Sequence, residues 1–109
     1  MKVTDHFNWD YYDVPEHTRE ALANYFIHCY EPGSFLMAVL CNDLTGAATR
    51  SDHINRDALA SIAQWVLHNA PNGSWGNREI VNDWLKKGEY QQYFEKKLVV
   101  KILSEDHYE

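Results

Sequence analysis

The stretch INRDALASIAQWVLHNAPNG, residues 54–73, decides the fold class of this chain. Its apolar residues recur every three or four positions, which is the spacing of one face of an α-helix. We expect that inward face to comprise Leu59, Ile62, Ala63, Val66, Leu67 and Ala70. The stretch therefore predicts a helix, and the segments on either side repeat the same kind of pattern.

The ends of this helix carry recognisable signals. Asn55 is a good N-cap, and Ile54 before it is placed to pack on Leu59 as a hydrophobic staple. Pro71-Asn72-Gly73 ends the pattern because proline and glycine interrupt a helix. We predict one helix over residues 55–70.

A second helix is predicted upstream, over residues 14–30. Asp13 can cap it, Glu16 can reach back three positions later, and Pro15 suits a first turn. Pro32-Gly33 stops it. The apolar face at helical spacing is Ala21, Leu22, Tyr25, Phe26 and Cys29.

A central helix is predicted over residues 35–49, with Ser34 before it as its cap. Its stripe is Leu36, Leu40, Leu44, Ala47 and Ala48. The apolar run 35–40 would also suit a buried strand, but the length of the pattern favours a helix. Asn42 and Asp43 interrupt the stripe, and in a central helix they would be partly buried and hydrogen-bonded to neighbouring helix ends or to a loop.

Two further patterns complete a bundle. A short helix is expected from Asn77 to a stop at Gly88, and its inward residues are Ile80, Val81, Trp84 and Leu85. The last pattern is helical through Tyr90, Phe94, Leu98 and Ile102, although residues 98–103 also suit a strand. We predict an all-α fold: a compact single-domain bundle of about five short helices over 14–103. An irregular aromatic, acidic arm, extended or with a short strand, precedes it over 1–13, and an acidic tail follows over 104–109.

The charge balance narrows the classes of partner. Ten basic and 16 acidic residues give a net charge of −6 over 109 residues, which disfavours general nucleic-acid binding and attachment to anionic membranes. The longest apolar run, 35–41, is too short to span a bilayer, and the N-terminus has no apolar run typical of a signal peptide. We expect a cytoplasmic protein. A basic stretch is the one place suited to phosphate contact, although a solvated helix face explains it better: Lys86, Lys87, Lys96, Lys97 and Lys101.

The residues that could bind a metal or act as nucleophiles are not spaced in the patterns that such sites require. The six histidines form no HxxxH or HExxH pair and no CxxC occurs, so we expect no metal and no cofactor. Cys29 and Cys41 lie in apolar runs, which predicts two buried free thiols with raised pKa values, a disulfide being the alternative. Ser34 and Ser74 stand in no nucleophile-elbow pattern. We therefore predict no catalytic residue.

Two segments are candidates for binding. The arm carries Trp9, Tyr11 and Tyr12, and Tyr and Trp beside acids are typical of protein-binding surfaces. The alternative is that these side chains strap the arm onto its own domain.

The second segment is the loop 72–77, which presents Trp75 between two glycines. We include Trp75 among the candidate partner-binding residues, while favouring its folding back over the core. A candidate small-molecule pocket would combine this loop with the polar interruption of the central helix: Asn42, Asp43, Ser74 and Asn77. The loop matches no nucleotide-binding motif.

A wider pattern also stands out. The stretches HTREAL (17–22), EPGSFL (31–36), NDL (42–44), DHIN (52–55) and NAPNGSWG (69–76) together resemble a group of small proteins encoded by tailed bacteriophages. The resemblance covers about residues 14–87. It implies expression inside an infected bacterium, where small accessory proteins bind and redirect host machinery, and it implies no catalytic residue.

These observations favour a non-enzymatic accessory protein that binds another protein, such as an inhibitor or modulator of a host or defence protein in the host cytoplasm. One alternative is a small-molecule or nucleotide-binding protein that uses Asn42, Asp43 and the loop Gly73–Asn77. Another is an acidic DNA mimic, for which a net charge of −6 is mild. A homodimer formed by exchange of the arm is a further expectation.

Overall fold

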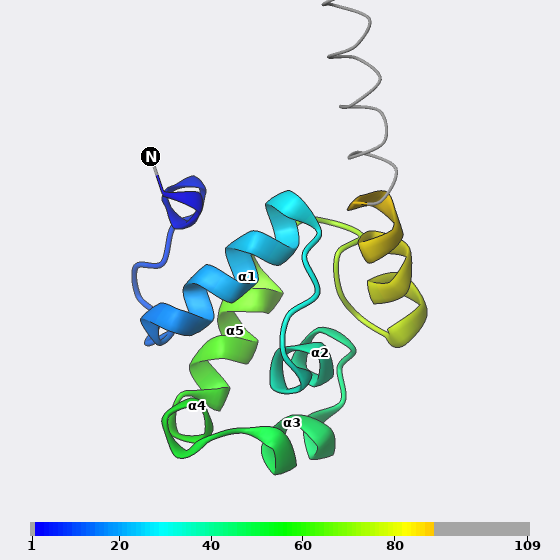
Figure 1. The fold of residues 1–109 in the computed structure, drawn as a ribbon. Helices are drawn as coiled ribbons and strands as arrows, with labels where there is room; N and C mark the ends of the chain where they lie inside the picture. Colours follow the sequence, from blue (N-terminus) through cyan, green and yellow to red (C-terminus); the bar gives the residue numbers. More distant parts are fainter. Residues whose placement is uncertain (1, 89–109) are drawn as a thin grey trace, which may run out of the picture.

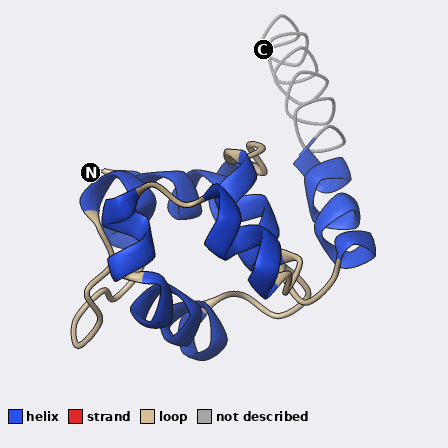
Figure 2. Ribbon diagram, turned by 90° about the horizontal axis from the view of Figure 1, so that it is seen from below, coloured by secondary structure: helices blue, strands red, loops and turns tan. Residues whose placement is uncertain are grey.

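The computed structural model describes residues 2–88, and within this range every regular element is a helix (Figure 2). The predicted all-α fold is confirmed. The fifth predicted helix, its alternative strand 98–103 and the tail 104–109 lie outside the described residues. The elements in chain order are the 3-10 helix η1 (Val3–His6), α1 (Glu16–His28), α2 (Ser34–Leu40), α3 (Leu44–Arg50), α4 (His53–Asp57), α5 (Leu59–Asn69) and a last helix over 78–88.

A single hydrophobic core joins these helices. Figure 1 shows α1 lying across α5, with α3 and α4 at one end of the molecule and the last helix at its side. Burying one large apolar side chain contributes about 1.5–3 kcal/mol. The largest fully buried apolar and aromatic side chains are Trp65, Tyr25, Leu22, Leu40, Ile62, Val66 and Val81.

The N-terminal arm belongs to this core. Residues 3–6 form a helical turn instead of the extended chain or strand that we expected, and Asp5 accepts a hydrogen bond from the Lys2 amide at its start. Phe7 and Trp9 are half-buried and pack against the core. The arm therefore packs against the helices that follow it.

The predicted apolar face of α1 is confirmed, but the predicted ends are wrong. Pro15 occupies the N-cap position and its carbonyl accepts from the amides of Thr18 and Arg19, so Asp13 lies too early to cap. The helix ends before Pro32, because Cys29 adopts a left-handed conformation with φ 56°. The Cys29 amide donates to the carbonyl of Tyr25 and the Tyr30 amide to that of Asn24, so backbone hydrogen bonds close the helix around its left-handed residue.

The predicted helix over 35–49 is two helices. Asn42 turns the chain with φ 62°, a left-handed conformation that Asn tolerates better than most residues. The Asp43 side chain then caps α3 by accepting from the Gly46 amide at 3.0 Å. Both polar residues are exposed, so the expectation of partial burial was wrong. Ser34 is the first residue of α2, whose N-cap is Gly33 and not Ser34.

The predicted helix over 55–70 is also split, at Ala58. Asp52, three residues before Asn55, is the true N-cap of α4, because its carboxylate accepts from the Asn55 amide at 2.7 Å. Asn55 is buried, and its side-chain oxygen accepts from the Thr18 hydroxyl at 2.6 Å. A residue predicted to cap a helix instead joins α4 to α1.

The inward face of α5 is rotated from the predicted one. Ile62 and Val66 are buried as expected, but Ala63 is exposed and Leu67 is 60% exposed. Trp65, which the spacing left out, is fully buried. Apolar residues surround much of this helix, so periodicity alone does not choose between these faces.

The last helix begins as predicted, since the Asn77 side chain accepts from the Ile80 amide at 2.9 Å. Val81 is buried, and the Trp84 indole donates to the carbonyl of Tyr25 at 2.9 Å. Gly88 is still helical and is not a stop within the described residues. A Cβ at Gly88 would collide with that of Cys29, so the glycine permits close approach of the two segments.

The predicted and the observed inward faces of α5 differ in which residue's truncation should destabilise the protein, Leu67 or Trp65. Trp65→Ala should cost about 3–5 kcal/mol in free energy of unfolding, because it empties a fully buried site. Leu67→Ala, the matched control in the same helix, should change it by less than about 0.5 kcal/mol. Urea unfolding followed by circular dichroism measures both. Equal losses for the two variants would contradict the observed orientation of α5.

Candidate functional site

Trp9, predicted to bind a partner, is half-buried and packs against the core. Its ring stacks on Trp65 with centroids 4.1 Å apart and an interplanar angle of 13°. Because Trp65 occupies one face, the Arg19 guanidinium, 5.8 Å from the ring centroid, lies over the other. The indole N–H donates to the carbonyl of Thr4 at 2.9 Å. Trp9 therefore straps the arm to the domain.

The two tyrosines of the arm differ in exposure. Tyr12 is half-buried, with its ring 6.3 Å from that of His68. Tyr11 is 98% exposed and has φ 73°, which is unfavourable for a bulky residue. Of the three predicted binding residues in the arm, only Tyr11 offers its whole side chain to solvent.

The glycine loop 72–77 is tied to two helices. The Gly76 amide donates to the carbonyl of Leu40 at 2.8 Å, at the end of α2. Ser74 is fully buried, its hydroxyl donates to the Pro71 carbonyl, and its own carbonyl accepts from the Tyr25 hydroxyl at 2.7 Å. Trp75 is half-buried and packs on the core, the arrangement that we favoured for it.

The four predicted pocket residues do not form one site. Asn42 and Asp43 line a pocket of about 70 Å³, whose other walls are Val39, Leu44, Ala47, Leu59 and Ala63. Ser74 is buried in the glycine loop and Asn77 caps the last helix. Since small-molecule sites usually span about 300–1,000 Å³, this pocket is too small for a nucleotide.

The walls of this pocket belong to a larger apolar area. Leu44, on α3, is 73% exposed, and Leu67, on α5, is 60% exposed. Leu59, Ala63 and Leu67 are four residues apart in turn, so they form one stripe along α5. We call this area, made by Val39, Leu44, Ala47, Leu59, Ala63 and Leu67, the α3–α5 surface. The Asp43–Arg50 ion pair, 3.8 Å long, stands at its edge.

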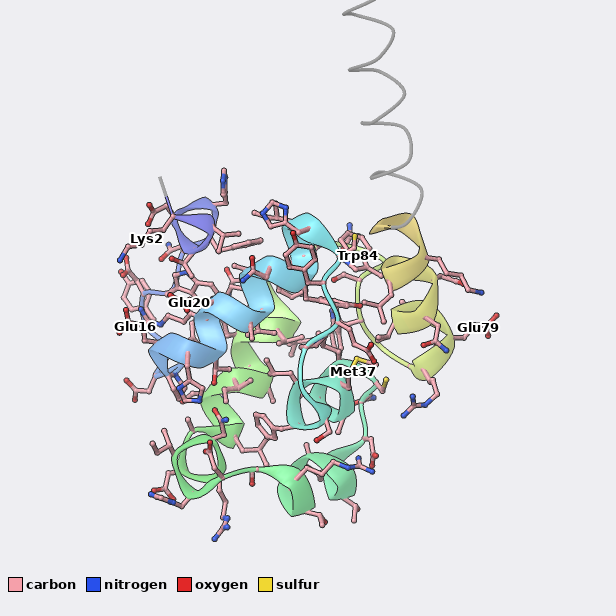
Figure 3. All side chains as sticks on the ribbon, viewed as in Figure 1. Lys2, Glu16, Glu20, Met37, Glu79 and Trp84 are labelled. Atoms are coloured by element: carbon pink, nitrogen blue, oxygen red, sulfur yellow. The ribbon has the colours of Figure 1, made fainter. Side chains whose placement is uncertain are left out.

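A larger hollow lies where the arm meets α1. We call it the η1–α1 groove, and its volume is about 530 Å³. Figure 3 shows the side chains of Lys2, Glu16 and Glu20 gathered on this side of the molecule. Its lining comprises Lys2, Thr4, Asp5, Phe7, Trp9, Val14, Glu16, Arg19 and Glu20.

Reactive groups are spread apart. Among residues 2–88, no three His, Cys, Asp or Glu side chains are grouped to hold a metal ion. Cys29 and Cys41 are free and half-buried, and desolvation raises the pKa of both thiols, which lowers their thiolate fraction at neutral pH. No helix in the described part of the chain is both long and apolar enough to cross a membrane.

Two of the five lysines of the basic stretch are described. Lys86 and Lys87 are both exposed, and the Lys87 ammonium lies 4.8 Å from the Trp84 ring centroid. Lys96, Lys97 and Lys101 lie outside the described residues. The described pair is thus partly engaged with the protein itself.

Comparison of the chain with family models, with curated proteins and with solved structures found no match.

Sequence reasoning missed the α3–α5 surface because it assigned Leu44, Ala63 and Leu67 to the core. A signal was present: the polar pair Asn42-Asp43 directly before Leu44 matches the end of one helix and the cap of another. The η1–α1 groove had no local signal, since it exists only after the arm folds against α1.

Alanine substitutions at the two glycines of the loop should lower the unfolding free energy by different amounts. Gly73→Ala should cost about 1–2 kcal/mol in unfolding free energy, because φ 81° is strained for alanine although no atom crowds the site. Gly76→Ala should cost more, since φ 137° is nearly closed to other residues and Ile80 lies close. Chemical denaturation of both variants tests this order. The reverse order would contradict the observed loop.

Both cysteine thiols should be alkylated more slowly in the folded protein than in the unfolded chain. Because burial raises their pKa values, the thiolate fraction at pH 8 is smaller in the folded protein than in the unfolded chain. Iodoacetamide should therefore modify Cys29 and Cys41 more slowly in buffer than in denaturant. Mass spectrometry follows the reaction. Faster alkylation of either cysteine in the folded protein would reveal an activated thiol and contradict this assignment.

Proposed function

We propose that this protein acts by binding another protein, through the α3–α5 surface. It is a non-enzymatic accessory protein of the kind that inhibits or modulates a host or defence protein. The resemblance of residues 14–87 to a group of tailed-bacteriophage proteins supports the context, which is the cytoplasm of an infected bacterium.

The exposure of large apolar side chains on α3 and α5 carries this proposal. Leu44 and Leu67 keep 73% and 60% of their surface in water, although the same chain buries Leu22 and Leu40 completely. Contiguous exposed apolar area is typical of sites where proteins associate. A small apolar pocket between the two leucine-bearing helices adds a recess for a partner side chain.

The arm supports a secondary role at most. Trp9 is stacked internally and Tyr12 is half-buried, so Tyr11 alone is free to contact a partner. A surface needs several neighbouring buried contacts to provide affinity, and one exposed tyrosine is a weaker candidate than the α3–α5 surface. The two regions lie on different elements and can be tested separately.

The two alternatives from the sequence have less support. A nucleotide site made from Asn42, Asp43 and the glycine loop would need these groups to share a cavity, whereas they line or occupy separate places. A DNA mimic would act through charge, and the feature that stands out on the described chain is apolar.

Leu44→Gln/Leu67→Gln should reduce capture of a protein partner from lysate of infected bacteria by more than tenfold. Each substitution removes the free energy that burial of a leucine side chain contributes to binding, about 1.5–3 kcal/mol. Quantitative mass spectrometry after affinity capture measures the loss. Circular dichroism should show unchanged folding, because both side chains are exposed.

Tyr11→Ser is the matched control, since it removes the most exposed aromatic side chain from the arm. It should leave capture within about twofold of the original protein. Loss of the partner with Tyr11→Ser and retention with the leucine variant would assign binding to the arm and contradict the proposal.

A further inference from the structure

The exposed side of α5 carries no formal charge. The helix contains no Asp, Glu, Lys or Arg, whereas charged side chains are exposed on α1, α3, α4 and the last helix of the described chain. Helix α2 is also uncharged, but Ser34 alone of its residues is exposed. Since helices at a protein surface typically carry charged residues on their outer face, the composition of α5 suits a face that another apolar surface covers.

The exposed residues of α5 form one stripe. Ala63 lies three positions after Ala60 and four before Leu67, so the three share one side of the helix. Gln64, one turn after Ala60, borders them and is also exposed. The two alanines allow a second helix to approach closely, because the distance between packed helices depends on the side chains at the contact. Leu67, 60% exposed, projects from the other half of the stripe.

The pocket of the α3–α5 surface adjoins the first half of this stripe. Leu59 and Ala63 of α5 line it together with Leu44 of α3, and its volume is about 70 Å³. Leu44 and Ala63 are exposed, so the pocket reaches the surface. Asp43 also lines it, and the carboxylate of this residue is already paired with Arg50 of the same chain. The pocket is thus a mainly apolar recess on the scale of one side chain.

An antiparallel second copy of α5 brings the projecting leucine and the pocket together. In a two-fold symmetric pair of helices, a residue four positions after the axis lies opposite the residue four positions before it in the other copy. With the axis at Ala63, Leu67 of each chain therefore lies opposite Leu59 of the other chain. Because Leu59 lines the pocket, each leucine meets the recess of the second copy.

The absence of charge on α5 is what this symmetry requires. Residues near a two-fold axis face their own counterparts, so a charged residue there would meet a like charge. At Ala63 the pairing brings together alanine, glutamine and leucine side chains, and no like charges. The same pairing through α1 would bring Glu16 and Glu20 of one copy close to those of the other.

We propose that a second copy of this protein covers the exposed stripe of α5, in a two-fold symmetric dimer that inserts Leu67 of each chain into the pocket of the other. The inference rests on the proposed function in taking the α3–α5 surface as a docking surface, and it adds what covers that surface before another protein binds. The contact involves fewer residues than the roughly 20–30 per side of a stable interface, so the dimer is weak. A tighter partner displaces the second copy, and dimerisation and partner binding exclude each other.

Sedimentation equilibrium of the purified protein, from about 10 µM to about 1 mM, tests this assignment. The average mass should rise with concentration toward that of two chains and stop there, because a two-fold contact closes on itself. A mass equal to that of one chain over the whole range would overturn the proposal. Growth beyond two chains would show an open, head-to-tail contact and would overturn it too.

Charged substitutions at Ala63 test the position of the axis. Ala63→Glu and Ala63→Lys each place like charges on the axis, and each should raise the dissociation constant of the dimer at least tenfold. An equal mixture of the two variants should dimerise again, because opposite charges then meet. Asn82→Glu is the matched control, since it adds the same charge to an exposed site on the last helix, and it should dimerise like the original protein. Circular dichroism should show unchanged folding, because Ala63 is exposed.

The outcomes separate this inference from the proposed function. Dimerisation that survives both Ala63 variants would place the contact elsewhere, such as in an exchanged arm, and a mixture that stays monomeric would exclude an axis at Ala63. Either result overturns the inference. A chain that dimerises as described but captures no other protein keeps the inference and contradicts the proposed function, whereas a monomeric chain that captures a protein does the reverse.

Discussion

The burial of the Trp65 indole is the constraint on which the rest of the structure depends. Its ring meets those of Trp9, Phe7 and Phe26, with centroids 4.1, 5.8 and 6.0 Å away. A buried indole N–H needs an acceptor, and the carbonyl of Asn8 supplies one at 2.8 Å. One side chain of α5 thus binds the N-terminal arm to α1 by stacking and by a hydrogen bond.

This arrangement decides which surfaces remain for function. Once Trp65 faces the arm, the opposite flank of α5 turns Ala63 and Leu67 toward solvent. The same packing places η1 next to α1 and creates the η1–α1 groove. The aromatic residues that made the arm look like a binding segment are mostly the means by which it folds.

The sequence predicted the elements better than their ends or faces. Helicity, the apolar face of α1 and the start of the last helix near Asn77 follow from local spacing, and local spacing is enough to predict them. Asp52 and Asn55 are both good caps, and the choice between them depends on a bond from Asn55 to Thr18 that is 37 residues away in the chain. The rotation of α5 likewise depends on contacts from the arm, so local spacing could not choose its exposed face. Tyr11, predicted to bind a partner, is exposed.

Hydrogen exchange of the tryptophan indole groups, followed by proton–nitrogen NMR, tests most directly whether the arm is part of the core. The N–H groups of Trp9 and Trp65 both donate to carbonyl oxygens within the arm. They should stay protected for about as long as the backbone amide of Val66 in α5. Rapid exchange of both indoles while the Val66 amide remains protected would show a free arm, and would contradict the account given for Trp65 and for the surfaces that its orientation exposes.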